Sequence, residues 1–432
     1  VPLKGNLEQV YCEVSQPEIL TDSALYLHKG NLVHSGLGGL DTSYTGKGVI
    51  VGIVDQGIDY NHPDFQNSDG STRVLRYWDH TVNDENHPNY YTLYDKGIVW
   101  DNTSINNGTC TSLEVGTAHG STVSGMAVSN ASANGTNKGF APEANIIVVE
   151  SDFNQEVNNW KLSIADACDY IFKVADSLGM PAVINLSLGS YYGTHDATDP
   201  AAELINSLLD EKSGRIVVCA AGNSGQQGPY HVGQEVTDDT TFVWSKPNPN
   251  STIVNNASNV VIYDFVVDTL QDNFNFSISA RHEASNYHES GATPFIPFGS
   301  SFTSGVPQYE NIINSNGDLI AVAFVYREYL AGNIIGQIAI SGPNFTPIDS
   351  TGYVYGFKTF GSGHYDLWGG SFSGRSDFVS DLTDASQVPG IIFYNAPDTL
   401  QTIVDSWNCS DKVISVGNLR NLSLIHISEP TR

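Results

Sequence analysis

The chain has 432 residues, of which 40% are hydrophobic and 10% aromatic, so it is long enough to bury a sizeable core. Its 47 acidic residues outnumber its 19 Lys and Arg residues and give a formal net charge of -28, which disfavours nucleic acids and anionic membrane surfaces as partners. No apolar run approaches the length that crosses a bilayer, so we expect no transmembrane segment.

The sequence has neither an initiator Met nor a charged-then-apolar leader, and we expect it to start inside a longer translated product, so that any signal peptide lies outside these residues. Five scattered cysteines show no metal-binding spacing, and their odd number rules out a complete set of intramolecular disulfides. Cys168 and Cys219 fall in helix and strand patterns, where we expect them to be small buried residues.

The first part of the chain is mixed in pattern. Residues 3–15 are compatible with a strand or with part of a small α+β unit, residues 22–28 with a short helix, and residues 34–46 with a linker. Residues 49–54 form a nearly unbroken run of β-branched and apolar residues, which is typical of a strand buried on both faces. This strand ends at Asp55. The polar and aromatic stretch 68–116 has no lasting period and predicts surface loops with short hairpins.

From His119 to about residue 221 the pattern alternates between helices and strands. His119 stands at the first turn of a helix of small residues. Further helices are predicted at 160–178 and 199–212, the latter with Asp199 as N-cap before Pro200, and strands at 146–149, 182–188 and 215–221. This rhythm predicts an α/β fold with a doubly wound, mostly parallel sheet.

The rhythm stops at Pro229. Residues 229–388 are rich in Gly, Ser, Asn, Thr and aromatic residues and predict a β-sandwich inserted into the α/β domain. The predicted strands are 260–267, 273–280, 318–326, 334–340 and 352–360. Residues 390–394 and 412–416 return to apolar strand type, as expected if the parallel sheet resumes there.

Three polar residues stand where elements of the predicted sheet meet its carboxyl edge, which is where catalytic groups gather in such sheets. His119 has the chemistry of a general base, Asp55 that of a carboxylate that orients it, and the Asn223 amide that of an oxyanion donor. Ser187, Leu188 and Gly189 form an extended segment that could pair with a peptide as an added strand. Each residue alone is more commonly structural, as a strand-ending Asp, a hydrogen-bonding His or a turn Asn.

Five ordered motifs together resemble the subtilisin-like serine proteases, the subtilase family (peptidase S8). They are Val-Asp55-Gln-Gly-Ile-Asp-Tyr-Asn-His-Pro-Asp-Phe, His119-Gly-Ser-Thr-Val-Ser-Gly, Gly139-Phe-Ala-Pro-Glu-Ala, Asn185-Leu-Ser-Leu-Gly and Ala220-Ala-Gly-Asn223. Gln56 stands where Ser or Thr is usual, and Ser121 and Thr122 replace the common Thr and His. The order and spacing agree over about residues 46–225, and Val413-Ile-Ser-Val-Gly resembles the next strand of the family.

The resemblance implies a secreted or cell-surface serine endopeptidase that cleaves proteins or peptides through an Asp-His-Ser triad. It implies no cofactor for catalysis, while structural calcium is possible, with ligands that the sequence does not identify. The Gly-Thr-Ser-Met-Ala-type motif of the nucleophile is absent from the 432 residues, and Ser124, Ser187 and Ser224 stand in other motifs. We therefore expect a C-terminally truncated, inactive fragment.

We expect five segments. They are an N-terminal extension or pro-segment remnant (1–39), the first part of the catalytic domain (40–228), an inserted β-rich domain (229–388), the resumed and truncated catalytic domain (389–418) and a non-native tail (419–432), whose end resembles translated sequencing adapter.

Two alternatives belong to other classes of protein. One is a pseudoprotease or surface adhesion protein on a subtilisin-like scaffold, which the absent serine favours and the intact Asp55 and His119 motifs disfavour. The other is a metal hydrolase using Asp55, Asp59 and His62, which lacks a second cluster of ligands.

Overall fold

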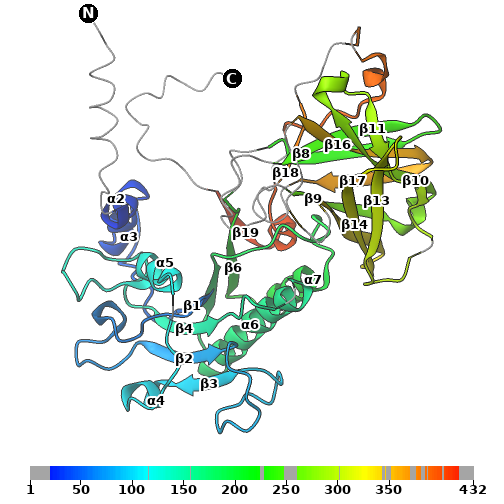
Figure 1. The fold of residues 1–432 in the computed structure, drawn as a ribbon. Coiled ribbons are helices and arrows are strands. Elements are labelled where there is room, and N and C mark those ends of the chain that lie inside the picture. Colours follow the sequence, from blue (N-terminus) through cyan, green and yellow to red (C-terminus); the bar gives the residue numbers. More distant parts are fainter. Residues whose placement is uncertain are drawn as a thin grey trace, which may run out of the picture. The chain divides into compact units, whose positions relative to one another are not determined.

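The computed structural model describes residues 20–114, 116–155, 157–223, 228–247, 260–300, 302–342, 346, 352–369, 376–380, 385–386, 388–400 and 403–417. The predictions for residues 3–15 and for the tail 419–432 lie outside these residues. The chain divides into two compact units, Val1–Ser187 with Leu208–Val218 and Leu188–Ser207 with Cys219–Arg432. Figure 1 labels helices and strands of both units.

A mixed sheet of seven strands runs through the α/β part of the described chain, in the order β19-β6-β5-β1-β4-β2-β3. Strand β1 pairs in parallel with β4 and β5, and β2 pairs in parallel with β4 and antiparallel with the edge strand β3. The predicted mostly parallel sheet is therefore confirmed. The strands are β1 (Ile50–Asp55), β2 (Val74–Asp79), β3 (Ile98–Asp101), β4 (Asn145–Glu150), β5 (Ala182–Leu186), β6 (Arg215–Ala220) and β19 (Ile414–Val416).

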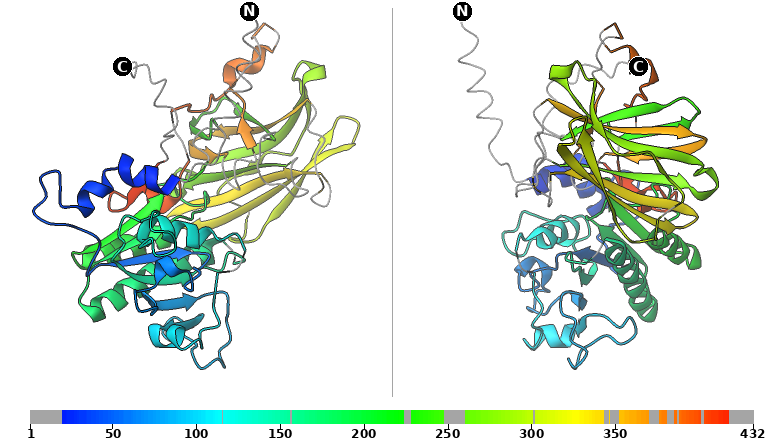
Figure 2. Two further views of the ribbon diagram at one scale, coloured as in Figure 1. Left: turned by 90° about the vertical axis from the view of Figure 1, so that its left-hand side faces the viewer. Right: turned by 45° about the vertical axis from the view of Figure 1, so that its right-hand side comes forward.

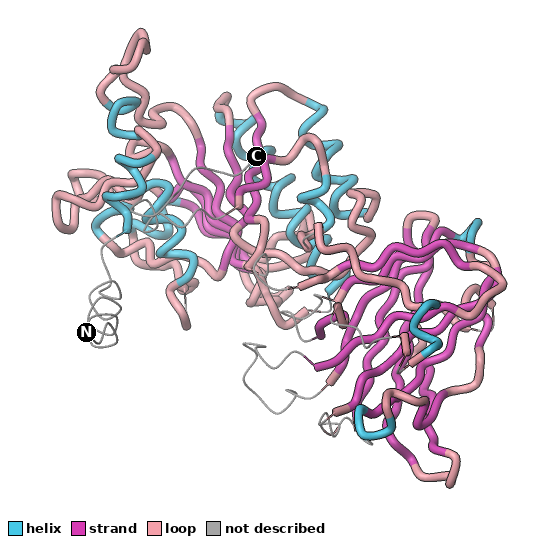
Figure 3. The backbone as a smooth tube through the Cα atoms, turned by 90° about the horizontal axis from the view of Figure 1, so that it is seen from above, coloured by secondary structure: helices cyan, strands magenta, loops and turns pink. Residues whose placement is uncertain are grey.

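Strand β1 is buried along its whole length, as its apolar run predicts. Val51 and Ile53 pack into the same cluster as Val128 at the end of α5 (His119–Val128). Gly52 points the other way, where an added Cβ would lie 2.9 Å from Ile171 of α6 (Val157–Leu178). Helices thus cover both faces of the sheet, as Figure 3 shows, and the doubly wound arrangement is confirmed.

The predicted helices at 22–28, 160–178 and 199–212 are confirmed as α2, α6 and α7. Asp199 caps α7, because its Oδ1 accepts the N–H groups of Ala201 and Ala202, each at 3.2 Å. In the part of the chain that the structure describes, no helix is long and apolar enough to cross a membrane. Besides α5 and α6, the α-helices in the described residues are α2 (Leu20–Leu27), α3 (Gly30–His34), α4 (Asn102–Asn106) and α7 (Pro200–Glu211).

Surface loops with short hairpins are predicted at 68–116, and β2 and β3 do pair antiparallel there, but their place on the surface is wrong. Tyr77 and Trp78 of β2 are completely buried, and β2 lies between β4 and β3 in the sheet. Arg76 interrupts the apolar run, so the strand is too short and irregular in sequence to show a period, and its pairing with β4 makes it a strand.

The second unit contains a separate antiparallel sheet. In the described residues its strands follow the path β18-β8-β16-β10-β11-β13-β14-β15-β9-β17-β7, and β12 pairs with β10. The five predicted strands correspond to β9, β10, β14, β15 and β16. The full set is β7 (His231–Val236), β8 (Thr241–Pro247), β9 (Val261–Asp268), β10 (Phe274–His282), β11 (Glu289–Ala292), β12 (Ile296–Pro297), β13 (Gln308–Asn314), β14 (Leu319–Leu330), β15 (Asn333–Ser341), β16 (Tyr353–Gly361), β17 (Gly363–Trp368) and β18 (Ser376–Phe378).

Alternate residues of these strands share one core, which explains the period of two in the sequence. Phe274, Phe276, Ile278 and Ala280 of β10 all belong to this cluster. Figure 2 shows the strands, in green to orange, strongly twisted. An antiparallel β-rich region is therefore confirmed, whereas its arrangement as a sandwich stays a prediction.

The prediction that the chain returns to the parallel sheet is correct for only one of the two predicted segments. Strand β19 confirms the prediction for 412–416, but residues 390–394 fall on a 3-10 helix, Pro389–Phe393, followed by Tyr394. The Tyr394 hydroxyl bonds Val379 and Trp244, so this segment packs on the antiparallel sheet. A run of three apolar residues after Pro-Gly does not separate a strand from a helical turn, and here the packing decides.

Candidate active site

Asp55 and His119, predicted from the sequence as a pair, are in contact in the first unit. Asp55 ends β1 with only 1% of its side chain exposed, whereas the His119 side chain at the start of α5 is 50% exposed. The His119 Nδ1–H donates to Asp55 Oδ1 at 2.7 Å. Because a carboxylate only accepts, this bond places the proton on Nδ1 and leaves Nε2 as the basic atom of a neutral ring.

Asp55 itself is held by the backbone that follows it. Its Oδ1 also accepts the Gln56 N–H at 2.8 Å, while Oδ2 is buried without a hydrogen-bond partner among the described residues. Gln56, which stands where the family usually has Ser or Thr, turns away from Asp55, and its Oε1 accepts the Thr117 hydroxyl at 2.7 Å. The departure at position 56 therefore links the Asp55 turn to the segment that precedes His119.

A carboxylate from a loop caps helix α5. The residue before His119, Ala118, has φ 56° and makes no side-chain cap. Glu114 accepts the N–H groups of Gly120 at 2.7 Å and Ser121 at 3.1 Å instead. A negative charge at a helix N-terminus satisfies free N–H groups and interacts favourably with the helix dipole, so Glu114 fixes the turn that carries His119.

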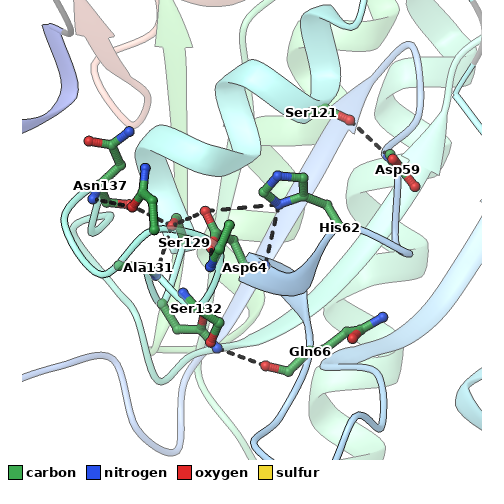
Figure 4. Close-up of polar contacts among 12 residues, drawn as sticks. Asp59, His62, Asp64, Gln66, Ser121, Ser129, Ala131, Ser132 and Asn137 are labelled. Atoms are coloured by element: carbon green, nitrogen blue, oxygen red, sulfur yellow. Dashed lines mark hydrogen bonds and ion pairs between the residues drawn. The ribbon is translucent and has the colours of Figure 1, made fainter.

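The turn after β1 packs directly against α5. An added Cβ on Gly120 would clash with the carbonyl oxygen of Gly57 and lie 3.3 Å from Asp55 Cβ. The Asp59 N–H also donates to Ser121 Oγ at 2.8 Å (Figure 4). The absence of a side chain at position 120 therefore allows the approach that brings His119 to Asp55.

A buried acidic group lies beside Asp55 in the sheet. Glu150 ends β4 in parallel register with Asp55, and its Oε2 accepts the Tyr77 hydroxyl at 2.7 Å. Burial, with the negative charges of Asp79 and Glu114, raises the pKa of Glu150 to about 8, against the opposing effect of the Tyr77 bond. Glu150 is thus a neutral acid over most of the physiological pH range.

A second polar network ties the loop after α5 to the Asp55 motif. Asp64 Oδ2 accepts the Ser129 hydroxyl at 2.9 Å, and Oδ1 accepts the Ala133 N–H at 2.8 Å. Figure 4 shows Asp64 between His62 and Ser129, with Ser129 also reaching Asn137. Both Asp64 oxygens accept protein donors, and Asp64 thereby joins the Asp55 motif to the loop after α5.

The metal-hydrolase alternative has no support in the described residues. Asp55 is engaged by His119, Asp59 Oδ1 accepts the Asn61 N–H at 3.1 Å, and His62 Nδ1 accepts the Asp64 N–H at 3.3 Å. Among the residues that the structure describes, no group of three or more His, Cys, Asp or Glu could hold a metal ion.

The other predicted site residues lie outside this pair. Asn223 is exposed and follows β6, and the segment from Ser187 to Gly189 follows β5 without joining the sheet. Ser187 belongs to the first unit, and Leu188, Gly189 and Asn223 belong to the second. Asp55 and His119 are therefore in contact within the first unit, whereas Asn223 belongs to the second unit.

Three residues at these places were missed by sequence reasoning. Glu150 could have been found, because it ends a strand that is parallel to the one ending in Asp55. Glu114 lies in a loop without a pattern, and Tyr191, which contacts Asn223, follows the extended segment without a motif. Neither of these two carries a sequence signal.

A buried carboxylate at the end of a parallel strand, bonded to a half-exposed histidine at a helix start, suits a hydrolase that uses histidine as a base. Comparison with protein families matches residues 46–356 to the subtilase family, Peptidase S8. The match covers more than half of the chain, and the chain belongs to this family.

Individual relatives agree with this assignment. The PII-type proteinase of Lacticaseibacillus paracasei is 30% identical over 191 residues, which cover 43% of this chain but 10% of that protein. The serine protease AprX of Bacillus subtilis is 30% identical over 227 residues, covering 51% of this chain and 42% of the relative. The minor extracellular protease Vpr of the same species is 30% identical over 189 residues, covering 44% of this chain and 19% of the relative. The chain thus spans less than half the length of these relatives.

A solved structure shares the fold across almost the whole chain. The CspB protease of Clostridium perfringens superposes with a TM-score of 0.61 over 92% of this chain and 73% of its own, at 20% sequence identity. At this identity the likeness establishes the fold alone.

Proposed function

We propose that the protein is a secreted or cell-surface serine endopeptidase that hydrolyses peptide bonds in proteins. The observation that carries the proposal is the 2.7 Å bond from the half-exposed His119 to the buried Asp55. Membership of the subtilase family and the similarity to proteinases support it. The name of one relative, an extracellular protease, supports the location outside the cell.

His119 acts as general base in this proposal. Its Nε2 takes the proton from a serine hydroxyl while the serine oxygen forms a bond to the carbonyl carbon of the substrate. The Asp55 carboxylate stabilises the imidazolium that results and keeps the proton of the ring on Nδ1. Nε2 then passes the proton to the leaving amine as the peptide C–N bond breaks. An acyl-enzyme results, and the same base activates the water that hydrolyses it.

The Asn223 side-chain amide stabilises the negative oxygen formed in this step, and the segment Ser187-Leu188-Gly189 pairs with the substrate backbone. Asn223 is exposed at the end of β6, as a group that meets a substrate must be. We assign the nucleophile to none of Ser124, Ser187 and Ser224. The Ser124 side chain is completely buried in α5, which supports leaving it out.

The reaction needs only amino-acid side chains, of which the nucleophilic serine stands outside the motifs of these 432 residues, so we propose that catalysis requires no cofactor. Structural calcium, which the family resemblance implies, stays a proposal without assigned ligands. The partners are protein or peptide substrates, and the net charge of -28 argues against nucleic acids.

We also propose that residues 229–388 form a β-sandwich domain inserted into the catalytic domain of residues 40–228 and 389–418. The chain leaves the mixed sheet after β6 and returns as its neighbour β19, and the Ala221 N–H donates to the Val416 carbonyl at 3.0 Å. Every strand pair that the described residues form in the sheet between these points is antiparallel, which supports a separate domain.

The protein produced from its gene tests the proposed function. It should react with a fluorophosphonate probe and cleave an unfolded protein substrate, and both activities should fall in Asp55→Ala and His119→Ala. By analogy with the triad of subtilisin, the loss in kcat should be roughly 10⁴- to 10⁶-fold. His288→Ala, the same change at an exposed histidine of the antiparallel region, should leave both activities unchanged. A wild-type protein without either activity, or an active His119→Ala variant, would rule out the proposed mechanism.

A further inference from the structure

Tyr191 lies against the segment that carries the proposed oxyanion donor. The Asn223 N–H donates to the Tyr191 hydroxyl oxygen at 3.0 Å. An added Cβ on Gly222 would clash with this oxygen and lie 3.0 Å from Cε1 and 3.1 Å from Cζ of the ring. Both residues belong to the second unit, so this contact lies within one compact body.

The residues on either side of Tyr191 are fixed by other contacts. The Ser190 N–H donates to Asp405 Oδ2 at 2.6 Å, and the buried Tyr192 donates its hydroxyl to Glu328 Oε1 at 2.8 Å. The hydroxyl groups of Thr194 and Ser406 form a hydrogen bond of 3.1 Å. Because these anchors hold the backbone, the half-buried Tyr191 ring is held over Gly222.

A substrate must approach the same place. An oxyanion donor works at about 2.7–3.1 Å from the oxygen, so the substrate residue that carries the attacked carbonyl has to lie beside Asn223. If the substrate backbone pairs with Leu188 and Gly189 as an added strand, its side chains point alternately to the two faces of that strand. The side chain of the attacked residue then meets the surface formed by Gly222 and its neighbours.

Gly222 leaves space on this surface because it has no side chain, and the Tyr191 phenol takes up that space. We propose that Tyr191 is a specificity-determining residue that restricts the residue on the acyl side of the cleaved bond to small side chains such as Gly, Ala or Ser. The inference rests on the proposed peptidase function and adds the class of substrate.

Two peptides that differ only at the residue before the cleaved bond test this inference. Wild-type protein should cleave the Ala peptide with a kcat/KM at least about tenfold higher than that for the Phe peptide. Enzymes distinguish substrates that differ by one small group in a pocket by about 10- to 200-fold in kcat/KM. Tyr191→Gly should raise kcat/KM for the Phe peptide at least about tenfold. Tyr191→Phe keeps the volume of the ring and should keep the preference for Ala.

Tyr192→Phe is the matched control, because it removes the hydroxyl of the neighbouring tyrosine, which bonds Glu328, and should not change the preference. Peptide aldehydes ending in Ala or Phe should rank in the same order as inhibitors of the wild-type protein, which tests the inference without any variant. Equal cleavage of the two peptides by wild type, or an unchanged preference in a folded Tyr191→Gly variant, would overturn the inference alone. Failure to cleave either peptide would overturn the proposed function and the inference with it.

Discussion

At the scale of single residues, Gly120 sets how closely helix α5 approaches strand β1. An added Cβ there would clash with the Gly57 carbonyl oxygen, so Gly120→Ala should displace His119 from Asp55. We expect kcat to fall at least about 100-fold, since small misplacements of catalytic groups cost that much, and unfolding free energy to fall by about 1–3 kcal/mol. Peptide hydrolysis and urea unfolding measure the two effects.

Gly125 provides the control for this change on the same helix. An added Cβ at Gly125 would meet no atom within 4 Å, so Gly125→Ala should keep the activity. It should also gain up to about 1 kcal/mol of stability from helix propensity. Equal effects of the two substitutions would show that the close approach at Gly120 has no importance for the site.

Glu150 should make the stability of the protein depend on pH. The pKa of about 8 in the folded state lies above the ordinary value of 4.5, so folding takes up a proton between these values. The raised pKa lowers the unfolding free energy. This loss is absent below about pH 4.5, grows as the pH rises towards 8 and is constant above it. In Glu150→Gln the side chain at position 150 is neutral at every pH, so this loss of unfolding free energy does not occur.

Urea unfolding at about pH 5.5 and pH 7.5 measures this effect. Between the two pH values, wild type should lose about 1–3 kcal/mol more unfolding free energy than Glu150→Gln. Glu85→Gln removes the same charge from an exposed loop and should follow wild type. Parallel pH profiles of wild type and Glu150→Gln would contradict a raised pKa for Glu150.

The residues of the site differ in how far the sequence predicts them. Asp55 and His119 stand in motifs with fixed spacing, and the structure brings them into contact. Glu114 and Tyr191 make contacts that depend on how loops fold back, to Ser121 seven residues along the chain and to Asn223 32 residues along it. Contacts of this kind depend on the folded positions of loops and leave no local pattern.

At the scale of elements, Arg73 joins three segments around α5. Its guanidinium is almost completely buried and donates to the carbonyl oxygens of Asp64 at 3.0 Å, Val128 at 2.7 Å and Ala144 at 2.9 Å. These carbonyls belong to the short 3-10 helix Pro63–Phe65, to the end of α5 and to the turn before β4. One cation therefore holds the helix that carries His119 against the sheet.

Arg73→Met should remove the Arg73 donors from the buried carbonyl groups of Val128 and Ala144, while the Asp64 carbonyl keeps the Asn130 N–H, and it should lower the unfolding free energy by about 3–5 kcal/mol. Arg73→Lys should cost less, because it keeps the charge and some of the donors. Arg76→Met is the control, since among the described residues the Arg76 side chain donates to the carbonyl of Leu75 alone. Urea unfolding measures all three, and a loss in Arg73→Met no larger than in Arg76→Met would contradict this role.

Elements with a regular period in sequence could be predicted, and elements defined by their partners could not. Strands β1, β9 and β10 show their burial directly in their sequence, and the structure contains each of them. Strand β2 is recognisable only beside β4, and the apolar residues 390–394 form a helical turn because they pack against the antiparallel sheet. Tertiary contacts decide between the alternatives in both cases.

At the scale of the whole molecule, a subtilase fold is combined with an extensive antiparallel sheet. The similarity to the CspB protease over 92% of the chain indicates that this combination is a fold shared with another protein. The family match over residues 46–356 includes both parts. The central claim is that Asp55 and His119 act as one catalytic unit within this fold.

The most direct test of this claim is kcat for peptide hydrolysis by wild type, Asp55→Asn, His119→Ala and the double variant, each produced from the natural gene. Residues that act as a unit are strongly non-additive, so each single change should lower kcat at least about 10³-fold. The double variant should then lie within about tenfold of His119→Ala alone. Losses that multiply in the double variant, or single variants that keep the wild-type kcat, would contradict a catalytic pair.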